Sequence, residues 1–265
     1  MTVIDTTTQA DVVAFMEMEN DGYGVDSAEQ FLVGKLNEKD GAGTWAFIDA
    51  DARTGQADAL GNDAIKVGML YKPDAVTPMG TTAALNTVDF VNGGDSGPRN
   101  RPSLAQAFRD TTTGGTFVAV ANHLKSKGSA CDTPDAGDGQ GNCTEVRVRS
   151  AKLLASWLAT DPTGTGDPDV LILGDMNSYA KEDPITTLEG AGYANLIEQR
   201  NGREAYSYAF DGQWGYLDHA LGSASINSQV TGVGDWHVNA DEPGILDYNS
   251  EFKTPAQLAS LYAPD

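Results

Sequence analysis

Acidic, amide and imidazole side chains stand at or near the ends of several short apolar runs in this sequence. In chain order they are Glu17, Asn122, His123, Asp175, Asn177 and Asp218. A carboxylate suits a hard divalent cation, and a second carboxylate can orient or deprotonate a water molecule. An amide can hold a phosphoryl oxygen, and an imidazole can move a proton. Together these residue types favour metal-assisted hydrolysis of a phosphoester.

The stretch "DVLILGDMNSYAKEDPI" (169–185) shows the pattern most clearly, because its apolar run continues directly into Asp175 and Asn177. Taken singly, each residue has an ordinary structural explanation. A Gly-Asp-x-Asn sequence is commonly a turn, and a lone histidine at a strand end is usually structural. Glu17 could be an edge residue, with Glu19 as the alternative. Their shared position at the carboxyl ends of strands, where α/β sheets usually host chemistry, nevertheless favours the functional interpretation.

Alternating strands and helices must position these residues. The apolar runs predict strands over 10–20, 44–50, 64–73 and 167–175, and a hairpin over 101–126 around Thr113-Gly114-Gly115. The spacing of apolar residues predicts helices over 27–41, 144–161 and 182–193. Mostly turns are expected over 235–252. No internal repeat, linker or low-complexity tract divides the chain, so residues 1–265 are expected to form a single α/β domain.

The balance of charge restricts the partners that the chain can have. It carries 38 acidic and 17 basic residues, which gives a formal net charge of −21. Such a surface disfavours polyanionic partners, because phosphate binding normally uses a basic face. A bound divalent cation would supply positive charge locally, and salt would screen the repulsion. An acidic surface that serves solubility alone is the alternative.

Two cysteines, Cys131 and Cys143, flank a loop rich in glycine and aspartate, "SACDTPDAGDGQGNCTE". A disulfide between them would close a small ring and stabilise the fold by roughly 3 kcal/mol. Zinc is the rival, but a lone cysteine pair lacks two ligands and the loop contains no histidine. The sequence therefore favours a disulfide, which indicates an oxidising compartment.

The sequence contains no stretch of about 20 apolar residues, which a membrane-spanning helix would require. The first residues, "MTVIDTTTQADVV", contain neither the basic nor the apolar region of a signal peptide. A disulfide loop of the secreted type without a secretion signal predicts that the chain is part of a longer protein.

Several motifs in a fixed order resemble those of the endonuclease/exonuclease/phosphatase superfamily. They are "DVVAFMEMENDGYG", "IKVGMLYKP", "NRPSLAQAF", "ANHLKSKG", "LILGDMNSYAKEDPI" and "YLDHAL". The likeness extends over essentially the whole chain. It is strongest to the large secreted bacterial extracellular nucleases, which share a loop of the "CDTPDAGDGQGNC" type and a "WHVNADEP…LDYN" tail.

The resemblance implies a four-layer α/β sandwich, in which two mixed β-sheets pack face to face with helices outside. It also implies an extracellular, divalent-metal-dependent endonuclease that cleaves DNA, with RNA as a second substrate and with no membrane or obligate protein partner. Mg²⁺ or Mn²⁺ is the expected cofactor. By its position in the first motif, Glu17 matches the glutamate that binds the metal ion.

Other motif positions imply roles around the scissile phosphate. Asp175 and Asn177 match the pair that handles the attacking water and the phosphate, and His123 matches a histidine that assists at the phosphate. Arg101 stands where members often contact a substrate phosphate, although a plain surface arginine is an equal alternative. Asn122, next to the histidine, is also expected to bind substrate.

Two segments of the superfamily pattern are not found. A first strand with a metal-site asparagine and a final Ser-Asp-His segment have no counterpart, and neither His219 nor His237 occupies the latter motif. Asp218 matches the aspartate that orients the histidine of that final segment. The comparison therefore predicts a chain truncated at both ends, with one strand missing from each sheet and slower cleavage than a restored chain would show.

Two other functions remain open on the sequence alone. The first is a phosphoesterase of the same superfamily that acts on a phospholipid or a sugar phosphate. Aromatic loops facing a membrane would favour a lipid, and no exposed apolar hairpin is evident. The second is a catalytically inactive extracellular module with calcium as a structural ion. Its ligands would be Asp132, Asp135, Asp138 and Asn142, although their spacing misses the calcium-loop consensus and a solvated acidic loop is the simpler explanation.

Overall fold

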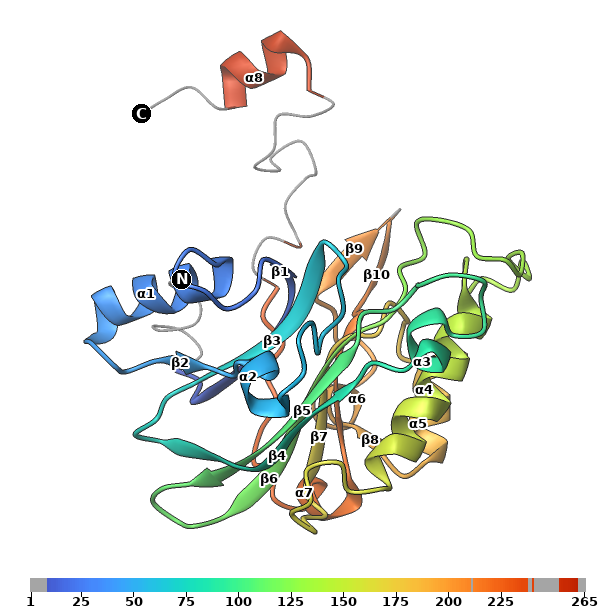
Figure 1. Cartoon of the computed structure of the whole chain (residues 1–265). Coiled ribbons are helices and arrows are strands. Elements are labelled where there is room, and N and C mark those ends of the chain that lie inside the picture. Colours follow the sequence, from blue (N-terminus) through green and yellow to red (C-terminus); the bar gives the residue numbers. More distant parts are fainter. Residues whose placement is uncertain (1–8, 211, 238–239, 241–252, 262–265) are drawn as a thin grey trace.

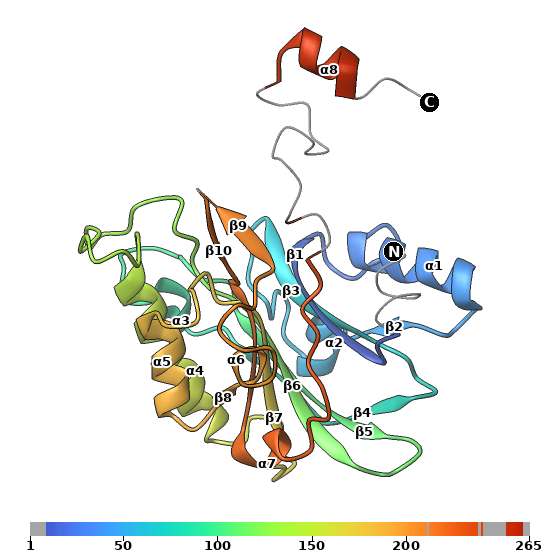
Figure 2. The same cartoon turned by 180° about the vertical axis from the view of Figure 1, so that it is seen from behind.

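The computed structural model describes residues 9–210, 212–237, 240 and 253–261, and its main body has four layers (Figure 1). Helix α1 (Ala28–Asp40) covers a small sheet, and the small sheet packs on a large one. The other face of the large sheet is covered by α3 (Val88–Asn92), α4 (Thr144–Leu158) and α5 (Asp183–Gly190). The view from behind shows the same order of layers (Figure 2). The expected four-layer α/β fold is therefore confirmed.

The small sheet has the strand order β1-β3-β2. Its strands are β1 (Val12–Glu19), β3 (Ile65–Tyr71) and β2 (Ala46–Phe47). Their pairings are antiparallel throughout the described residues, which corrects the expectation that both sheets are mixed. Helix α1 begins at Ser27, whose Oγ accepts a hydrogen bond from a first-turn N–H. Its residues Val33 and Leu36 pack against Trp45 and Leu70, which joins the first two layers.

The large sheet has the strand order β4-β5-β6-β7-β11-β8. Its strands are β4 (Val76–Leu85), β5 (Ser103–Asp110), β6 (Thr116–His123), β7 (Val170–Asp175), β11 (Asp218–Gly222) and β8 (Ala194–Asn195). Strands β5 and β6 form the hairpin that the sequence predicts. Strands β6 and β7 are parallel, and α4 lies in the crossover between them. Both strands consequently end at the same edge of the sheet.

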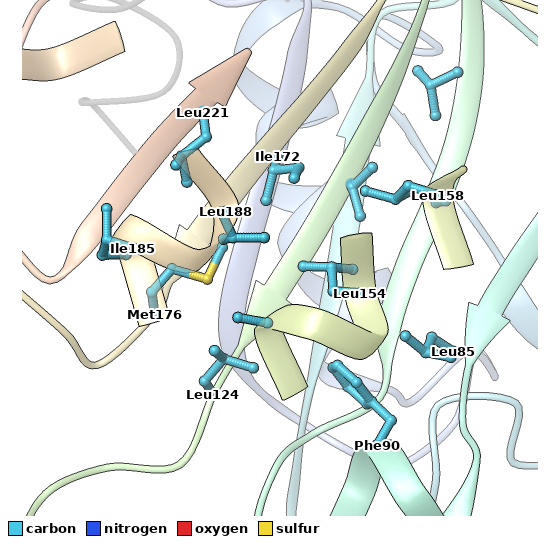
Figure 3. Close-up of a cluster of buried hydrophobic side chains, with 14 of the residues drawn as sticks. Leu85, Phe90, Leu124, Leu154, Leu158, Ile172, Met176, Ile185, Leu188 and Leu221 are labelled. Carbon is cyan, nitrogen blue, oxygen red and sulfur yellow. The ribbon is translucent and has the colours of Figure 1, made fainter. Parts of the chain in front are cut away.

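Apolar side chains bury the large sheet on both faces. Toward the helices, Leu154 of α4 and Leu188 of α5 pack against Ile172 of β7 (Figure 3). Toward the small sheet, Met69 of β3 packs in a cluster with Phe108 of β5. Each such buried side chain stabilises the fold by about 1.5–3 kcal/mol. Packing on both faces therefore fixes the strand ends that carry the polar residues.

Several elements have no clear signal in the sequence. They are β4, α2 (Ala50–Thr54), α6 (Leu196–Asn201), α7 (Ala224–Asn227), α8 (Pro255–Leu261), and a hairpin of β9 (Tyr208–Phe210) and β10 (Gln213–Gly215). Pro78 and Gly80 obscure β4, whose register against β5 shifts between Met79 and Ala83. Most of the tail 235–252, expected to be turns, lies outside the described residues. No helix among the described residues is long and apolar enough to cross a membrane.

The expected disulfide between Cys131 and Cys143 is present, with Cα atoms 5.2 Å apart. Cys143 directly precedes α4 and adopts a left-handed conformation with φ +65°. On the other side of the loop, Asp132 pairs with Arg99 at 3.2 Å. The bridge thus fixes the loop to the start of α4.

We expect the double variant Cys131→Ser/Cys143→Ser to lose about 3 kcal/mol of unfolding free energy, because the unfolded chain is no longer constrained by the ring. Urea unfolding of both proteins under non-reducing conditions measures this loss, and reduction of the unmodified protein should reproduce it. An unchanged urea midpoint would show that other contacts, such as the pair of Asp132 with Arg99, already hold the loop.

Candidate active site

Three adjacent strands of the large sheet place His123, Asp175 and Asp218 side by side. On the parallel pair β6–β7 the partner of His123 is Asp175, and on the antiparallel pair β7–β11 the partner of Asp175 is Asp218. Because neighbouring strands lie about 4.8 Å apart, the three backbones span about 10 Å. The structure thus brings together three of the residues that the sequence singled out.

Gly174 shows why a glycine precedes the acid at the end of β7. It has φ +124°, and a Cβ atom there would lie 2.1 Å from the backbone oxygen of Asn122 on β6. Only glycine permits such a close approach of the two strands. The missing side chain therefore allows the next residues, His123 and Asp175, to lie beside each other.

We expect Gly174→Ala to lower the unfolding free energy by roughly 3 kcal/mol, because a methyl group would overlap the backbone of β6 at a left-handed position. Gly192→Ala is the matched control, since Gly192 also has a positive φ (+100°) but no atom within 4 Å of its Cβ position. Urea unfolding should show the larger loss at Gly174. Equal losses would mean that backbone strain alone, without contact to β6, accounts for the effect.

The small sheet contributes Glu17 through a β-bulge. The register of β1 against β3 shifts between Phe15 and Met18, and Glu17 adopts φ +62° within this shift. A bulge re-aims a side chain, and a left-handed glutamate is an uncommon conformation. The Glu17 side chain is 69% exposed, and its Oε1 lies 3.9 Å from Nε2 of His123. Glu17, rather than the alternative Glu19, therefore stands beside the residues of the large sheet.

Asn177 holds the carboxylate of Asp175. Its backbone N–H donates to Oδ1 at 2.7 Å, and its side-chain Nδ2 donates to Oδ2 at 3.0 Å. The same Nδ2 donates to the backbone oxygen of Leu124 at 2.9 Å, and Asn177 adopts φ +48°. Both hydrogens of its amide are engaged within the protein. Asn177 therefore supports Asp175 and, in this conformation, does not offer its N–H groups to a phosphate.

Asp175 is an acid that retains its proton close to neutral pH. Burial raises its pKa to about 7, and the charge of Asp218 adds to the rise. The backbone N–H of Asn177 opposes it, and Glu17 contributes a further increase. Burial, followed by the charges of Asp235 and Glu17, also raises the pKa of Asp218. A carboxylate with a pKa near 7 is suited to take up and release a proton during catalysis.

His123 is neutral at pH 7. Burial, followed by the positive charge of Arg101, lowers the pKa of its imidazole to about 4. Its Nε2 lies 3.7 Å from Oδ2 of Asp175, which is too long for a hydrogen bond. A neutral imidazole whose Nε2 is not committed to either nearby carboxylate can donate to or accept from a substrate oxygen.

The two residues expected to bind substrate lie in different environments. Arg101 donates its backbone N–H to the oxygen of His123 at 3.2 Å and pairs through Nε with Oδ2 of Asp63 at 2.9 Å. It therefore adjoins the site. Asn122 is fully buried, where Ser103 Oγ donates to its Oδ1 at 2.6 Å and its Nδ2 donates to two backbone oxygens. The expectation for Asn122 is corrected, because its amide is satisfied inside the sheet.

Arg147 is a supporting residue that sequence reasoning alone did not reveal. Its guanidinium is fully buried on α4, and Nε donates to Oγ of Ser178 at 3.1 Å. Its Nη atoms donate to the backbone oxygens of Lys125, Gln140 and Asn142. Arg147 thus joins the disulfide loop to the segment after Asp175, and its charge lowers the pKa of Asp175. A signal existed, since Arg147 shares the helical spacing of the buried Leu154 and Leu158.

Asp235 and His219 also adjoin the site. The charge of Asp235 raises the pKa of Asp218, so the two acids lie close together, although no sequence pattern singles out Asp235. His219 is buried on β11, and its Nε2 donates to the backbone oxygen of Ser178 at 2.7 Å. His219 therefore has a structural contact, as its position outside the motif suggests.

The acidic groups at this edge fit a hard divalent cation. Glu17 offers an exposed carboxylate beside Asp175 and Asp218, and its charge contributes to the raised pKa of both aspartates. A cation would relieve that repulsion, and Mg²⁺ usually takes one or two carboxylates together with waters and substrate phosphates. Among the described residues, no group of three or more His, Cys, Asp or Glu side chains could hold an ion unaided. Glu17 would therefore hold the metal together with water and substrate oxygens.

The acidic loop does not form a cation site in the part of the chain that the structure covers. Asp132 pairs with Arg99, and its Oδ2 accepts the backbone N–H of Ser96 at 2.8 Å. Asp135 and Asp138 each accept a backbone N–H from two residues further along the loop. These side chains shape the loop itself, which favours the simpler explanation of a solvated acidic loop.

Comparison with known families decides the membership of this chain. The model of the endonuclease/exonuclease/phosphatase family matches residues 3–241, which is most of the chain. The chain belongs to this family. It is accordingly a phosphoesterase of the endonuclease/exonuclease/phosphatase superfamily, whose members are hydrolytic enzymes that typically use divalent metal ions.

Solved structures of the endonuclease/exonuclease/phosphatase fold are similar to this chain. A family member from Bacteroides vulgatus has a TM-score of 0.57 and 15% identity, and the match covers 84% of this chain and 76% of that one. A mannosyl-6-phosphatase from Bacteroides thetaiotaomicron has a TM-score of 0.55 and 16% identity, with 84% and 74% covered. The human Nocturnin catalytic domain has a TM-score of 0.53 and 14% identity, with 82% and 70% covered. At these identities the likeness shows the fold alone, and no curated protein matches the sequence.

Proposed function

We propose that this protein is an extracellular, metal-dependent endonuclease that cleaves DNA, with RNA as a second substrate, in the manner of the secreted bacterial nucleases. The main support is the adjacency of His123, Asp175 and Asp218, with Glu17 reaching across from the small sheet. An acid with a pKa near 7, a neutral imidazole and an exposed carboxylate suit the hydrolysis of a phosphodiester. The disulfide supports an extracellular location.

The residues nearest the phosphate would share the work as follows. Glu17 would hold Mg²⁺ or Mn²⁺, whose positive charge would offset the negative charge that develops on a phosphoryl oxygen. Asp175 orients the attacking water and accepts its proton, because its pKa of about 7 matches the working pH. Asn177 keeps both carboxylate oxygens of Asp175 in place.

The remaining residues would stabilise the phosphate and adjust the pKa of Asp175, the general base. His123 donates a hydrogen from Nε2 to a phosphoryl oxygen as a neutral group, since its pKa is about 4. Arg101 would contact a neighbouring phosphate by exchanging its ion pair with Asp63. Asp218 keeps the pKa of Asp175 high, which makes the carboxylate a stronger base.

A panel of substrates tests this proposal against other phosphoesters. One of the similar structures is a mannosyl-6-phosphatase, so a sugar phosphate is a fair competitor. The protein is incubated with supercoiled plasmid, single-stranded RNA, mannose 6-phosphate and phosphatidylcholine, each in Mg²⁺, Mn²⁺ or EDTA. We expect nicking of the plasmid with either metal and none in EDTA. Release of inorganic phosphate from mannose 6-phosphate, without nicking of the plasmid, would contradict the proposed nuclease function and indicate a sugar phosphatase.

Glu17→Gln is expected to raise the Mg²⁺ concentration for half-maximal nicking by at least roughly tenfold, because a neutral amide is a poorer ligand for a hard cation. The rate at saturating Mg²⁺ should change less. Glu19→Gln is the matched control, since Glu19 is also exposed and lies on the same strand. A Mg²⁺ titration of each variant gives the comparison. The same shift for both variants would argue that Glu17 is no metal ligand.

A further inference from the structure

The β9–β10 hairpin presents three aromatic side chains to solvent. Its strands pair antiparallel, and the exposed fractions are 40% for Tyr208, 64% for Phe210 and 63% for Trp214. Figures 1 and 2 both show the hairpin projecting from the body of the molecule. The expectation that no exposed apolar hairpin exists is therefore corrected. Grouped exposed rings of this kind commonly mark a binding surface.

This hairpin directly precedes the Asp218 strand of the candidate active site in the chain, and it lies next to the site in space. Gly215, the last residue of β10, stands three positions before Asp218. A Cβ atom on Gly215 would lie 2.7 Å from the ring of Tyr179, which follows Asn177 by two residues. Trp214 stands four positions before Asp218, so their Cα atoms are at most about 14 Å apart. A polymer bound at Asp218 would therefore pass the hairpin.

A hollow of about 210 Å³ at the base of the hairpin combines rings with cations. Its lining includes Trp214, Gln213, Tyr179, Lys181 and Arg203. Arg203 is exposed, and no ion pair of its guanidinium occurs within the described part of the chain. Lys181 pairs with Glu198 at 2.5 Å. Flat rings beside a cation are the combination that binds a nucleotide, since the base stacks and the phosphate meets the charge.

We propose that the β9–β10 hairpin is a stacking platform for unpaired bases of the nucleic acid whose phosphate lies at Asp175. A base adjoining the cleaved bond would stack on Trp214, and Arg203, which lines the same hollow, would contact its phosphate. This inference rests on the proposed nuclease function. It further implies that single-stranded or frayed segments bind better than intact duplex.

A lipid surface fits this hairpin less well. All exposed large hydrophobic side chains of residues 205–216, within the described positions, are aromatic, and no aliphatic side chain accompanies them. Segments that lie in a membrane interface combine apolar side chains with lysine or arginine, whereas residues 205–216 contain neither basic residue. Rings with polar edges beside Gln213 and Arg203 are better suited to bases.

Binding of matched oligonucleotides tests the proposal. All measurements use the full chain in an Asp175→Asn background with Mg²⁺, so that cleavage of the DNA is slow relative to the binding measurement. Fluorescence anisotropy compares three labelled ligands of equal length: a single strand, an abasic single strand with the same phosphates, and a duplex. We expect the base-bearing single strand to bind most tightly. Trp214→Ala should weaken that binding roughly 5- to 100-fold, which corresponds to about 1–3 kcal/mol, and leave the abasic strand unaffected.

Two further variants serve as controls. Trp214→Phe keeps a ring and should retain most of the affinity for bases. Phe31→Ala removes another exposed ring, 66% exposed on α1 on the opposite side of the small sheet from the large sheet, and should change nothing. Equal affinity for the abasic and base-bearing strands would overturn the inference. So would vesicle binding that Trp214→Ala abolishes while binding of DNA remains unchanged.

The nuclease function and the stacking platform can fail separately. Hydrolysis of methyl p-nitrophenyl phosphate by the protein with an intact Asp175, measured in Mg²⁺ and in EDTA, reports the catalytic site without any nucleobase. If this diester is hydrolysed in a metal-dependent way but DNA binding does not depend on the bases, the proposed catalytic function is retained and the proposed stacking platform is refuted. Base-dependent binding that Trp214→Ala abolishes supports the platform even if the diester is not hydrolysed.

Discussion

Asp175→Asn is expected to slow DNA hydrolysis by roughly 10²–10⁴-fold while the protein stays folded, because an amide cannot accept a proton from the attacking water. The side chain keeps its shape and its acceptor for the backbone N–H of Asn177. The rate is measured as kcat/KM on a fluorescent oligonucleotide at saturating Mg²⁺. Circular dichroism confirms that the variant is folded.

Asp169→Asn is the matched control for this loss. Asp169 directly precedes β7, so it lies at the opposite end of the strand from Asp175. Its Oδ2 accepts a hydrogen bond from Gln229 at 2.5 Å, away from the acids of the candidate site. We expect its rate to stay within about twofold of the unmodified protein. A rate for Asp175→Asn as high as that of Asp169→Asn would contradict the assignment of Asp175 as the base.

The second large effect is a fall in stability as pH rises, caused by Asp175 and measured in EDTA. Its pKa is about 7 in the folded chain, against 3.8 in the unfolded one. Below pH 4 both forms are protonated and no penalty exists. Between pH 4 and 7 the unfolded chain releases the proton while the folded chain keeps it, so folding loses free energy. Above pH 7 the loss is complete, at roughly 4 kcal/mol.

The comparison with Asp175→Asn isolates this contribution. The variant does not ionise at position 175, so its stability relative to the unmodified protein should increase between pH 4 and 8. At any single pH, the difference in stability between the two proteins also includes the loss of one hydrogen bond. Asn177 Nδ2 donates to Oδ2 of Asp175, and the amide nitrogen that replaces this oxygen in Asp175→Asn cannot accept it. The change with pH is therefore the decisive quantity. Urea unfolding at several pH values measures it, and parallel curves for the two proteins would refute the raised pKa of Asp175.

The fold was predictable where apolar pattern and turn chemistry agree. The helix of 144–158, the strand at 170–175 and the hairpin of 103–123 follow directly from the spacing of buried residues. Strand β4 was not, because its exposed Thr77, Gly80 and Thr81 break the alternation and its pairing with β5 decides its conformation. The β9–β10 hairpin was missed because its rings face solvent and bury no core.

The sequence predicted which residues form the candidate site better than it predicted the contacts between them. The strand-end position marks Asp175 and His123, since parallel strands end at one edge. No sequence rule places Glu17 beside them, because its approach depends on a bulge and on the packing of one sheet upon the other. The burial of Asn122 likewise depends on Ser103 of the neighbouring strand. Contacts between distant segments are thus the part that required the structure.

The central claim is that the two sheets meet in a single metal-dependent site. Titration with Mn²⁺, followed by ¹H–¹⁵N NMR of the unmodified protein and of Glu17→Gln, tests it most directly because bound Mn²⁺ broadens nearby resonances. The predicted result is early broadening at Glu17, at Asp175 to Asn177 and at Asp218, which Glu17→Gln abolishes. Broadening that centres on residues 132–142, or that Glu17→Gln leaves unchanged, would contradict it.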